Sequence, residues 1–216
     1  MKRLTTQQQL ESEIKRLIAL EPRFGIVHQK HGTPSLRVAE ANLETLLMIV
    51  TEQFLSLKAA AAIWQRLAEA LGPITAEAVL AANPEKLKEL GLSSSKAKCF
   101  QACAEAPLDF GAAPDDLRKR LLEIWGIGPW TADIFMLTAI GHADAWPAGD
   151  LALQAATQNL LNLKARPNAR KMEEIATAWQ PHRASAARLL WAHYRGMNGL
   201  PQAPFTELIQ EVSIPS

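Results

Sequence analysis

The stretch at residues 121–154, LLEIWGIGPWTADIFMLTAIGHADAWPAGDLALQ, constrains the fold more than any other part of the chain. Gly126 and Gly128 flank Ile127, and this spacing lets the backbone bend sharply while an apolar side chain enters the core between two helices. Pro129 suits the first turn of the next helix, where no amide hydrogen is required. The pattern therefore predicts two helices joined by a tight hairpin.

The predicted hairpin also indicates a ligand. Backbone amides at a glycine turn and at a helix start are free to bind an anion, and a nucleic-acid phosphate is the anion we expect. Downstream, Pro147 and Gly149 bend the approach to Asp150, and an apolar helical pattern begins at Leu151. Taken alone, an aspartate at this position is an ordinary helix N-cap. Its sequence context leaves a second interpretation open, in which the carboxylate is catalytic.

The segments LEIWGIGPWTADIF and WPAGDLALQ together resemble the helix-hairpin-helix, Gly/Pro-Asp signature of the DNA glycosylase superfamily, and within it the 3-methyladenine DNA glycosylase II branch. Three more segments resemble elements of that family: QFLSLKAA at residues 53–60, GLSSSKA at 91–97 and WQPHRAS at 179–185. The resemblance covers about residues 43–191, most of the chain. It implies an all-α fold of two helical subdomains, with the hairpin at about residues 115–140 and a DNA- and base-binding cleft between the subdomains.

The rest of the chain agrees with a helical fold. Helical periodicity is clear at residues 5–20, 42–50 and 57–71, and no sustained alternation predicts a strand. Residues 21–25, EPRFG, predict a break after the first helix. We expect residues 1–216 to form a single glycosylase domain without the extra N-terminal β-domain that some members of the branch carry.

Composition excludes several classes of protein. No apolar run approaches a membrane span, and two cysteines, Cys99 and Cys103, are too few for an iron–sulfur cluster and are expected to be buried thiols. The net charge of +1 gives no overall attraction to nucleic acid, so DNA binding must depend on local charge and on backbone amides. With the resemblance, we expect a monomeric, cytoplasmic, nucleoid-associated bacterial protein whose partner is double-stranded DNA containing damaged bases.

The resemblance makes Asp150 the catalytic carboxylate. Cleavage of an N-glycosidic bond builds positive charge on the sugar, which a nearby anion stabilises, and the same anion can orient the attacking water. After Pro129 the chain has Trp130, where bifunctional relatives place a lysine that forms a Schiff base. We therefore predict a monofunctional glycosylase that releases alkylated purines such as 3-methyladenine and leaves an abasic site. Asp133 and Asp144 are predicted to be surface or turn residues.

The base pocket is predicted to be partly aromatic, because an alkylated purine can be cationic and the face of an aromatic ring attracts cations. Its predicted lining is Trp130, Ile134 and His182, the last at a position where the family usually has an aromatic residue. Phe54 is a candidate wedge for the gap left by an extruded nucleotide, with packing in the core as the alternative. Trp125 either touches DNA or only covers the hairpin. The residues predicted to contact DNA are Gln53, Phe54, Ser56, Lys96, Trp125, Gly126, Ile127, Gly128 and Thr131.

No cofactor is expected, apart from a structural Na⁺ or K⁺ ion that the backbone carbonyls of Leu122, Ile124 and Ile127 would hold, as in related hairpins. Two other functions stay open. One is a glycosylase for another lesion, such as deaminated adenine or a mismatched base, because His182 and Ile134 depart from the usual pocket. The other is a non-catalytic module that binds DNA through the hairpin alone.

Overall fold

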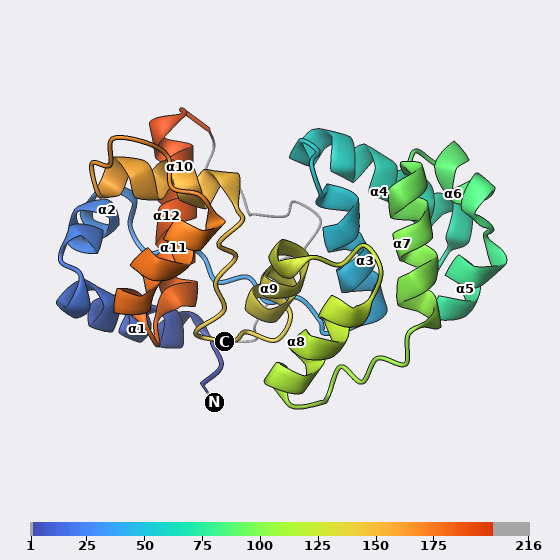
Figure 1. Cartoon of the computed structure of the whole chain (residues 1–216), viewed down its shortest axis with the longest axis horizontal. Helices are drawn as coiled ribbons and strands as arrows, with labels where there is room; N and C mark the ends of the chain where they lie inside the picture. The colour runs from blue at the N-terminus through green and yellow to red at the C-terminus, as the bar shows by residue number, and fades with distance from the viewer. Residues whose placement is uncertain (1, 201–216) are drawn as a thin grey trace. The chain divides into compact units, whose positions relative to one another are not determined.

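The computed structural model describes residues 2–200, so residues 1 and 201–216 of the predicted single domain lie outside the described part. The described residues form two compact units, both built from helices (Figure 1). Unit 1 contains residues 2–38 and 141–200, and unit 2 contains residues 39–140. The N-terminal segment and the C-terminal part of the described chain thus fold together.

The predicted all-α class is confirmed. Residues 2–200 contain helices and turns but no strand, and the β-type pairing among them is an isolated antiparallel bridge between Arg3 and His142. None of the helices in this part of the chain has both the length and the apolar run needed to cross a membrane.

Unit 1 is built around α12 (Arg183–Met197), which is buried from Ala184 to His193. This helix packs against α10, α2 and α1, and Figure 1 shows α10 and α12 next to each other. Trp179 fills the core beside them, with its ring edge-to-face with Phe24 at 5.1 Å and with Trp146 at 5.5 Å. The other elements of unit 1 are α1 (Gln7–Leu20), α2 (Arg23–His31), α10 (Leu151–Leu160), α11 (Ala169–Ala176) and the 3₁₀ turn η1 (Thr177–Trp179).

The break predicted at residues 21–25 is shorter than expected, and this prediction is corrected. Only Glu21 and Pro22 separate the two helices, because α2 already begins at Arg23. Proline is tolerated at a helix start, where the first amides have no partner within the helix. Phe24 then faces the core, and its burial favours continuing the chain as a helix.

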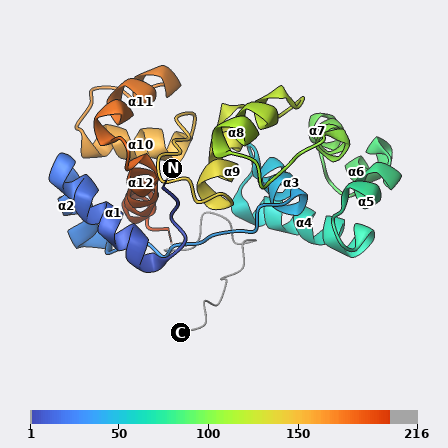
Figure 2. The ribbon, with the colours of Figure 1, turned by 90° about the horizontal axis from the view of Figure 1, so that it is seen from below.

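Unit 2 is built around α3 (Leu43–Glu52), which is buried from Thr45 to its end. This helix packs against α4, α7 and α9, while α5 and α6 pack against α7 (Figure 2). Helices α8 and α9 pack against each other, and the hairpin connects them. The other helices of unit 2 are α4 (Leu57–Leu71), α5 (Ala76–Ala81), α6 (Pro84–Glu89), α7 (Ser94–Glu105), α8 (Pro114–Glu123) and α9 (Pro129–Thr138).

Most helix starts are encoded locally. A short polar side chain precedes the helix and accepts a hydrogen bond from a backbone amide in its first turn, which satisfies one of the donors that has no partner within the helix. These N-cap residues are Thr6, Asn42, Ser56, Thr75, Asn83, Ser93, Asp150 and Asn168.

Candidate active site

The hairpin in unit 2 has the predicted geometry, but its two glycines differ. Gly126 has φ +88°, and a Cβ there would lie 2.8 Å from both Cβ and Sγ of Cys99. Glycine is therefore required twice over, by backbone conformation and by close approach. Gly128 has φ −94° and open space around it, so neither reason applies. Ile127 is buried between them, as predicted, and its amide donates to the carbonyl of Ile124 at 3.1 Å.

The C-terminal end of α3 is tied to this hairpin by Gln53. The Gln53 side-chain amide donates to Thr131 Oγ1 at 2.7 Å and to the Gly126 carbonyl at 3.5 Å. Thr131 is buried and its hydroxyl is engaged inside unit 2, and a contact of Thr131 with DNA stays a prediction. Gln53 and Thr131 were both predicted to contact DNA. In the structure their side chains form a hydrogen bond with each other.

Lys96 is also engaged within unit 2. Its Nζ donates to the carbonyls of Thr51 and Gln53, both at 2.7 Å, so the ammonium covers the negative end of α3. Partial burial lowers the pKa of this amine. The ammonium predicted to contact DNA thus holds the segment that leads into Phe54, and a contact of Lys96 with DNA stays a prediction.

Phe54 lies at the surface with its side chain fully exposed (101%). The alternative that it packs in the core is therefore wrong. Its φ of +56° is unusual for a residue with a side chain and costs on the order of 1–3 kcal/mol. Ser56 then caps α4 by accepting the amide of Ala59 at 3.2 Å. Phe54 therefore lies on a short loop that is anchored on both sides. Lys96 binds the carbonyl of Gln53 before it, and Ser56 caps α4 after it.

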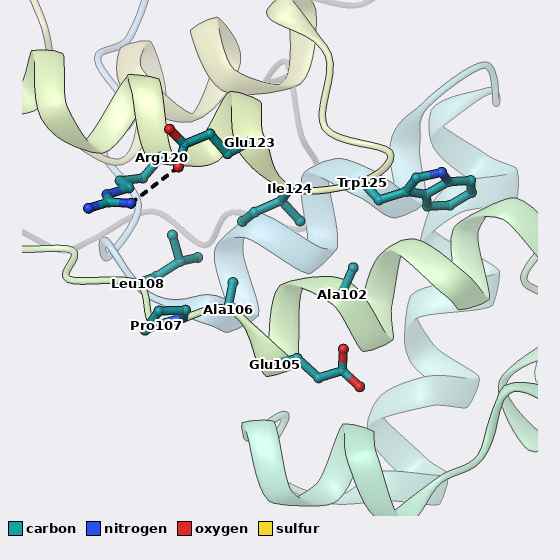
Figure 3. A pocket seen from close by; sticks show the side chains of 9 residues that line it. All are labelled: Ala102, Glu105, Ala106, Pro107, Leu108, Arg120, Glu123, Ile124 and Trp125. Carbon is teal, nitrogen blue, oxygen red and sulfur yellow. Dashed lines mark hydrogen bonds and ion pairs between the residues drawn. The ribbon is translucent and has the colours of Figure 1, made fainter.

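Trp125 occupies the outer side of the hairpin and is 47% exposed. The Nζ of Lys98 stands 4.3 Å from the centre of the indole ring, within cation–π range. Beside Trp125 lies a hollow of about 340 Å³, with Ile124 and Leu108 on its walls and an Arg120–Glu123 ion pair at its rim (Figure 3). Both sequence interpretations of Trp125 stay open, because about half of the residue is exposed.

Two of the residues predicted to line the base pocket lie on α9. Trp130, in the first turn, is partly exposed, as a base-stacking residue must be. Ile134, one turn later, is fully buried. Its side chain has no exposed surface in this structure, and a contact of Ile134 with a base stays a prediction.

Asp150 belongs to unit 1, where it is both an N-cap and a buried carboxylate. Its Oδ1 accepts the amide of Leu153 at 2.9 Å and the indole Nε1 of Trp191 at 3.3 Å, and the residue is 6% exposed. The backbone amide of Asp150 donates to the Pro147 carbonyl at 2.9 Å, which fixes the turn before α10. The carboxylate is therefore held in one orientation by a helix start and by a tryptophan from α12. Trp191 is a contact that sequence reasoning missed, since nothing local links it to Asp150.

His182 is the N-terminal neighbour of α12 and is also buried. Its Nδ1 lies 2.5 Å from Oε2 of Glu13, a residue of α1 that is 1% exposed. Glu13 in turn accepts from Lys2 and from Arg16. Burial opposes ionisation of Glu13, but the hydrogen bonds from Lys2 and His182 outweigh it and hold the pKa of this carboxyl below its usual value. No sequence signal identified Glu13, which reads as one more polar residue of an amphipathic helix.

Two other acidic residues near the hairpin and Asp150 are held by arginines. Asp133 is buried and accepts Arg118 Nε at 2.6 Å and Nη2 at 3.2 Å, which corrects the prediction that it is a surface or turn residue. The bidentate guanidinium makes burial of this carboxylate tolerable. Asp144 does lie in a turn, as predicted, with Arg183 bonded to both of its oxygens at 2.9 and 2.8 Å.

Potential metal ligands are sparse in the described part of the chain. Within residues 2–200 no group of three or more His, Cys, Asp or Glu side chains could hold a metal ion. Cys99 and Cys103 are buried with their sulfurs 4.0 Å apart, as predicted for free thiols. The carbonyls predicted to hold a monovalent ion stand at the end of α8 and in the hairpin, and this ion stays a prediction.

Comparison with known proteins assigns a family. The model of the HhH-GPD superfamily of base excision DNA repair proteins matches residues 47–181, more than half of the chain. A putative DNA-3-methyladenine glycosylase of Bacillus subtilis is 23% identical over 87% of this chain and 75% of its own length. A crystal structure of a Bacillus halodurans DNA-3-methyladenine glycosidase superposes with a TM-score of 0.73 at 26% identity, over 88% of this chain and 93% of that one.

A second solved structure has the same fold. It is an 8-oxoguanine glycosylase/lyase of Clostridium acetobutylicum bound to double-stranded DNA, with a TM-score of 0.73 at 15% identity, over 88% of this chain and 71% of that one. The region matched by the family model, residues 47–181, includes the glycine hairpin before α9 and the aspartate that caps α10. The chain belongs to the HhH-GPD superfamily of base excision DNA repair proteins.

Proposed function

We propose that this base excision DNA repair protein is a monofunctional DNA glycosylase that releases alkylated purines such as 3-methyladenine from double-stranded DNA and leaves an abasic site. The observation that carries the proposal is the environment of Asp150. A buried carboxylate, ordered by the Leu153 amide and the Trp191 indole, is available at one fixed position instead of sampling solvent.

The chemistry follows from that fixed charge. When the bond between C1′ and the base nitrogen breaks, the electron pair leaves with the base and the sugar becomes an oxocarbenium-like cation. A carboxylate held near C1′ stabilises this cation because it is already oriented and partly desolvated. A water molecule then adds its oxygen to C1′, and its proton passes to Asp150 or to solvent.

The absence of lyase chemistry is part of the proposal. A lyase needs an amine that attacks C1′ to form a Schiff base. The residue after Pro129 is Trp130, whose indole nitrogen is not a nucleophile. Its partly exposed ring instead suits stacking on an electron-poor alkylated base, an attraction of about 0.5–2 kcal/mol.

Unit 2 supplies groups for holding the duplex. The hairpin at Gly126–Gly128 offers amides at a helix start for a phosphate, and the exposed ring of Phe54 can stack where a base has been extruded. A Na⁺ or K⁺ ion on the carbonyls of Leu122, Ile124 and Ile127 would add positive charge beside that phosphate. Replacing K⁺ and Na⁺ with a large organic cation at constant ionic strength should weaken duplex binding if this ion is used.

The direct test is a panel of duplexes, each with one lesion, scored for free base and for strand breaks. We expect release of 3-methyladenine and breaks that appear only after alkaline treatment of the abasic site. Breaks before alkali, or trapping of a protein–DNA adduct by borohydride, would contradict the monofunctional assignment. Release of no base from any duplex would favour a binding module.

The variant Asp150→Asn tests the assignment of the carboxylate. Asparagine also caps helices, so stability should change by less than about 1 kcal/mol. Base release should fall by roughly a hundredfold or more while duplex binding persists. Asp109→Asn, which alters an exposed acidic residue of a loop, is the matched control and should leave release unchanged. Normal base release by Asp150→Asn would overturn the assignment.

A further inference from the structure

We infer that Glu13 is a positioning residue for the base pocket: it fixes His182 as the Nδ1–H tautomer, so that the neutral imidazole presents Nε2 as a hydrogen-bond acceptor and favours purines that carry an exocyclic amino group. This inference rests on the proposed function and on the sequence prediction that His182 lines the base pocket. It adds a substrate preference and the residue that sets it.

The first step is the bond between Glu13 and His182. A carboxylate can only accept hydrogen bonds, so the proton in the 2.5 Å contact between Oε2 and Nδ1 belongs to the imidazole. A neutral imidazole carries one proton, and with that proton on Nδ1 the other nitrogen, Nε2, bears a lone pair. Glu13 therefore selects the tautomer of His182.

The second step is that Glu13 stays ionised and in place. It is 1% exposed, and its carboxylate accepts from Lys2 and, at 2.7 Å, from Arg16. The Lys2 and Arg16 side chains are about half exposed, so they neutralise Glu13 without themselves being fully buried. Lys2 and Arg16 thus bind Oε1 of Glu13, and Oε2 accepts the hydrogen bond from His182.

The third step is the free end of the ring. His182 follows Trp179, whose carbonyl accepts the His182 amide at 2.8 Å, and it precedes the first turn of α12. Among residues 2–200 the Nε2 atom has no hydrogen-bond partner, and the side chain keeps 11% of its surface exposed. A buried ring with one nitrogen fixed and the other unpartnered is suited to a ligand that supplies the missing donor.

The fourth step separates this role from catalysis at the sugar. His182 stands before α12, and Trp191, which touches Asp150, lies on the same helix more than two turns later. At about 1.5 Å per residue the backbones of His182 and Trp191 are roughly 13 Å apart, so we assign His182 to the base and Asp150 to the sugar. The far edge of a purine is where amino and oxo groups differ, so His182 can influence which base is accepted.

The neighbouring charges bear on the protonation state of His182. From α1 and the N-terminal segment they are Glu13, Arg16 and Lys2; beside the start of α12 they are Arg183 and its partners Asp144 and Glu173. A protonated ring would donate from Nε2 and would favour an oxo group instead of an amino group.

The test combines a structural and a functional readout on the full chain. Nitrogen-15 NMR of the His182 ring at pH 8.5 should show protonated Nδ1 and bare Nε2 in the unaltered protein, and a mixture of tautomers in Glu13→Gln, because an amide can either accept or donate. With duplexes containing 3-methyladenine or hypoxanthine, the ratio of kcat/KM values should favour the amino purine and should fall about tenfold in Glu13→Gln, the value of one hydrogen bond. Glu11→Gln, an exposed change on the same helix, should alter neither readout.

The outcomes separate the two claims. Protonated Nε2 in the unaltered protein would overturn the inference even if Glu13→Gln failed to fold. If His182 had the expected tautomer but Glu13→Gln left the ratio of kcat/KM values unchanged, Glu13 would have no role in specificity. The proposed function would still hold as long as the protein released a base. If no duplex released a base, the proposed function and the specificity role would both fail, and the NMR result would still decide whether Glu13 positions the ring.

Discussion

The two units bury acidic side chains in different ways. In unit 1, Glu13 is surrounded by hydrogen-bond donors, and its pKa lies below the usual value despite burial. In unit 2, Glu52 is almost as inaccessible, but within residues 2–200 its carboxylate has no hydrogen bond or ion pair. Burial raises the pKa of Glu52 to about 8, against a smaller opposing effect of the Lys96 charge. The same burial thus gives an anion in one unit and a proton-bearing acid in the other.

The candidate functional residues differ in a parallel way. Those of unit 1, Asp150 and His182, are buried and held by partners from distant helices. Those of unit 2, Phe54 and Trp125, are exposed on loops. Bond cleavage benefits from a charge whose position and hydration are fixed beforehand, whereas holding a duplex needs accessible surface. The proposed function accordingly assigns the chemistry to residues of unit 1 and most of the DNA contacts to residues of unit 2.

The largest effect is expected at the hairpin. Gly126→Ala forces a side chain into a positive-φ position and against Cys99, so it should lower the free energy of unfolding by about 3 kcal/mol and weaken duplex binding. Gly128→Ala is the matched control, since φ is ordinary and no atom lies within 4 Å of the new Cβ. Denaturant titration and DNA binding measured for both variants check this. Equal losses of stability would show that the conformation of Gly126 is not what maintains the hairpin.

The second effect concerns Glu52 and sharpens the contrast between the acids. A carboxyl whose folded pKa is about 8, against about 4.5 unfolded, contributes stability at low pH that is lost as the pH rises toward 8. Between pH 5 and 8 this loss is on the order of 3 kcal/mol. Glu52→Gln should remove that part of the pH dependence, measured as unfolding free energy at several pH values. Glu44→Gln, exposed on the same helix, should not, and parallel curves for Glu52→Gln and the unaltered protein would refute the assignment.

The smallest effect on stability is expected at Phe54. Because the ring is fully exposed, Phe54→Ala should change the unfolding free energy by less than about 0.5 kcal/mol. Base release from a duplex should nevertheless fall about tenfold, since one stacked ring is worth about 1–3 kcal/mol. Leu80→Ala, also exposed in unit 2, serves as the control for loss of apolar surface. An unchanged rate of release from double-stranded substrate would remove Phe54 from the list of wedge candidates.

Where interactions are local, the sequence was a reliable guide. Pro129 begins α9, Asp150 caps α10 and Ile127 is buried between the hairpin glycines, each because a residue type satisfies a need of the backbone within four positions. The resemblance to the glycosylases rests on the same kind of short, ordered segments. The family match over residues 47–181 agrees with it.

Predictions were wrong where a long-range partner decides the role of a side chain. Asp133 was predicted to lie at the surface or in a turn, but it is buried and paired with Arg118, a residue 15 positions away. For Phe54, the alternative of packing in the core was wrong. A hydrophobic side chain alone does not reveal that the loop turns the ring toward solvent.

The sequence by itself determined the helical class, the hairpin and the family, because periodicity, caps and glycine turns act over a few residues. Only the tertiary structure decided which polar groups are ionised, fixed or free. The pairing of Glu13 with His182 and of Trp191 with Asp150 depends on helices that the chain brings together from distant positions. The free energy of a buried charge is set by such neighbours, and no short segment of sequence specifies them.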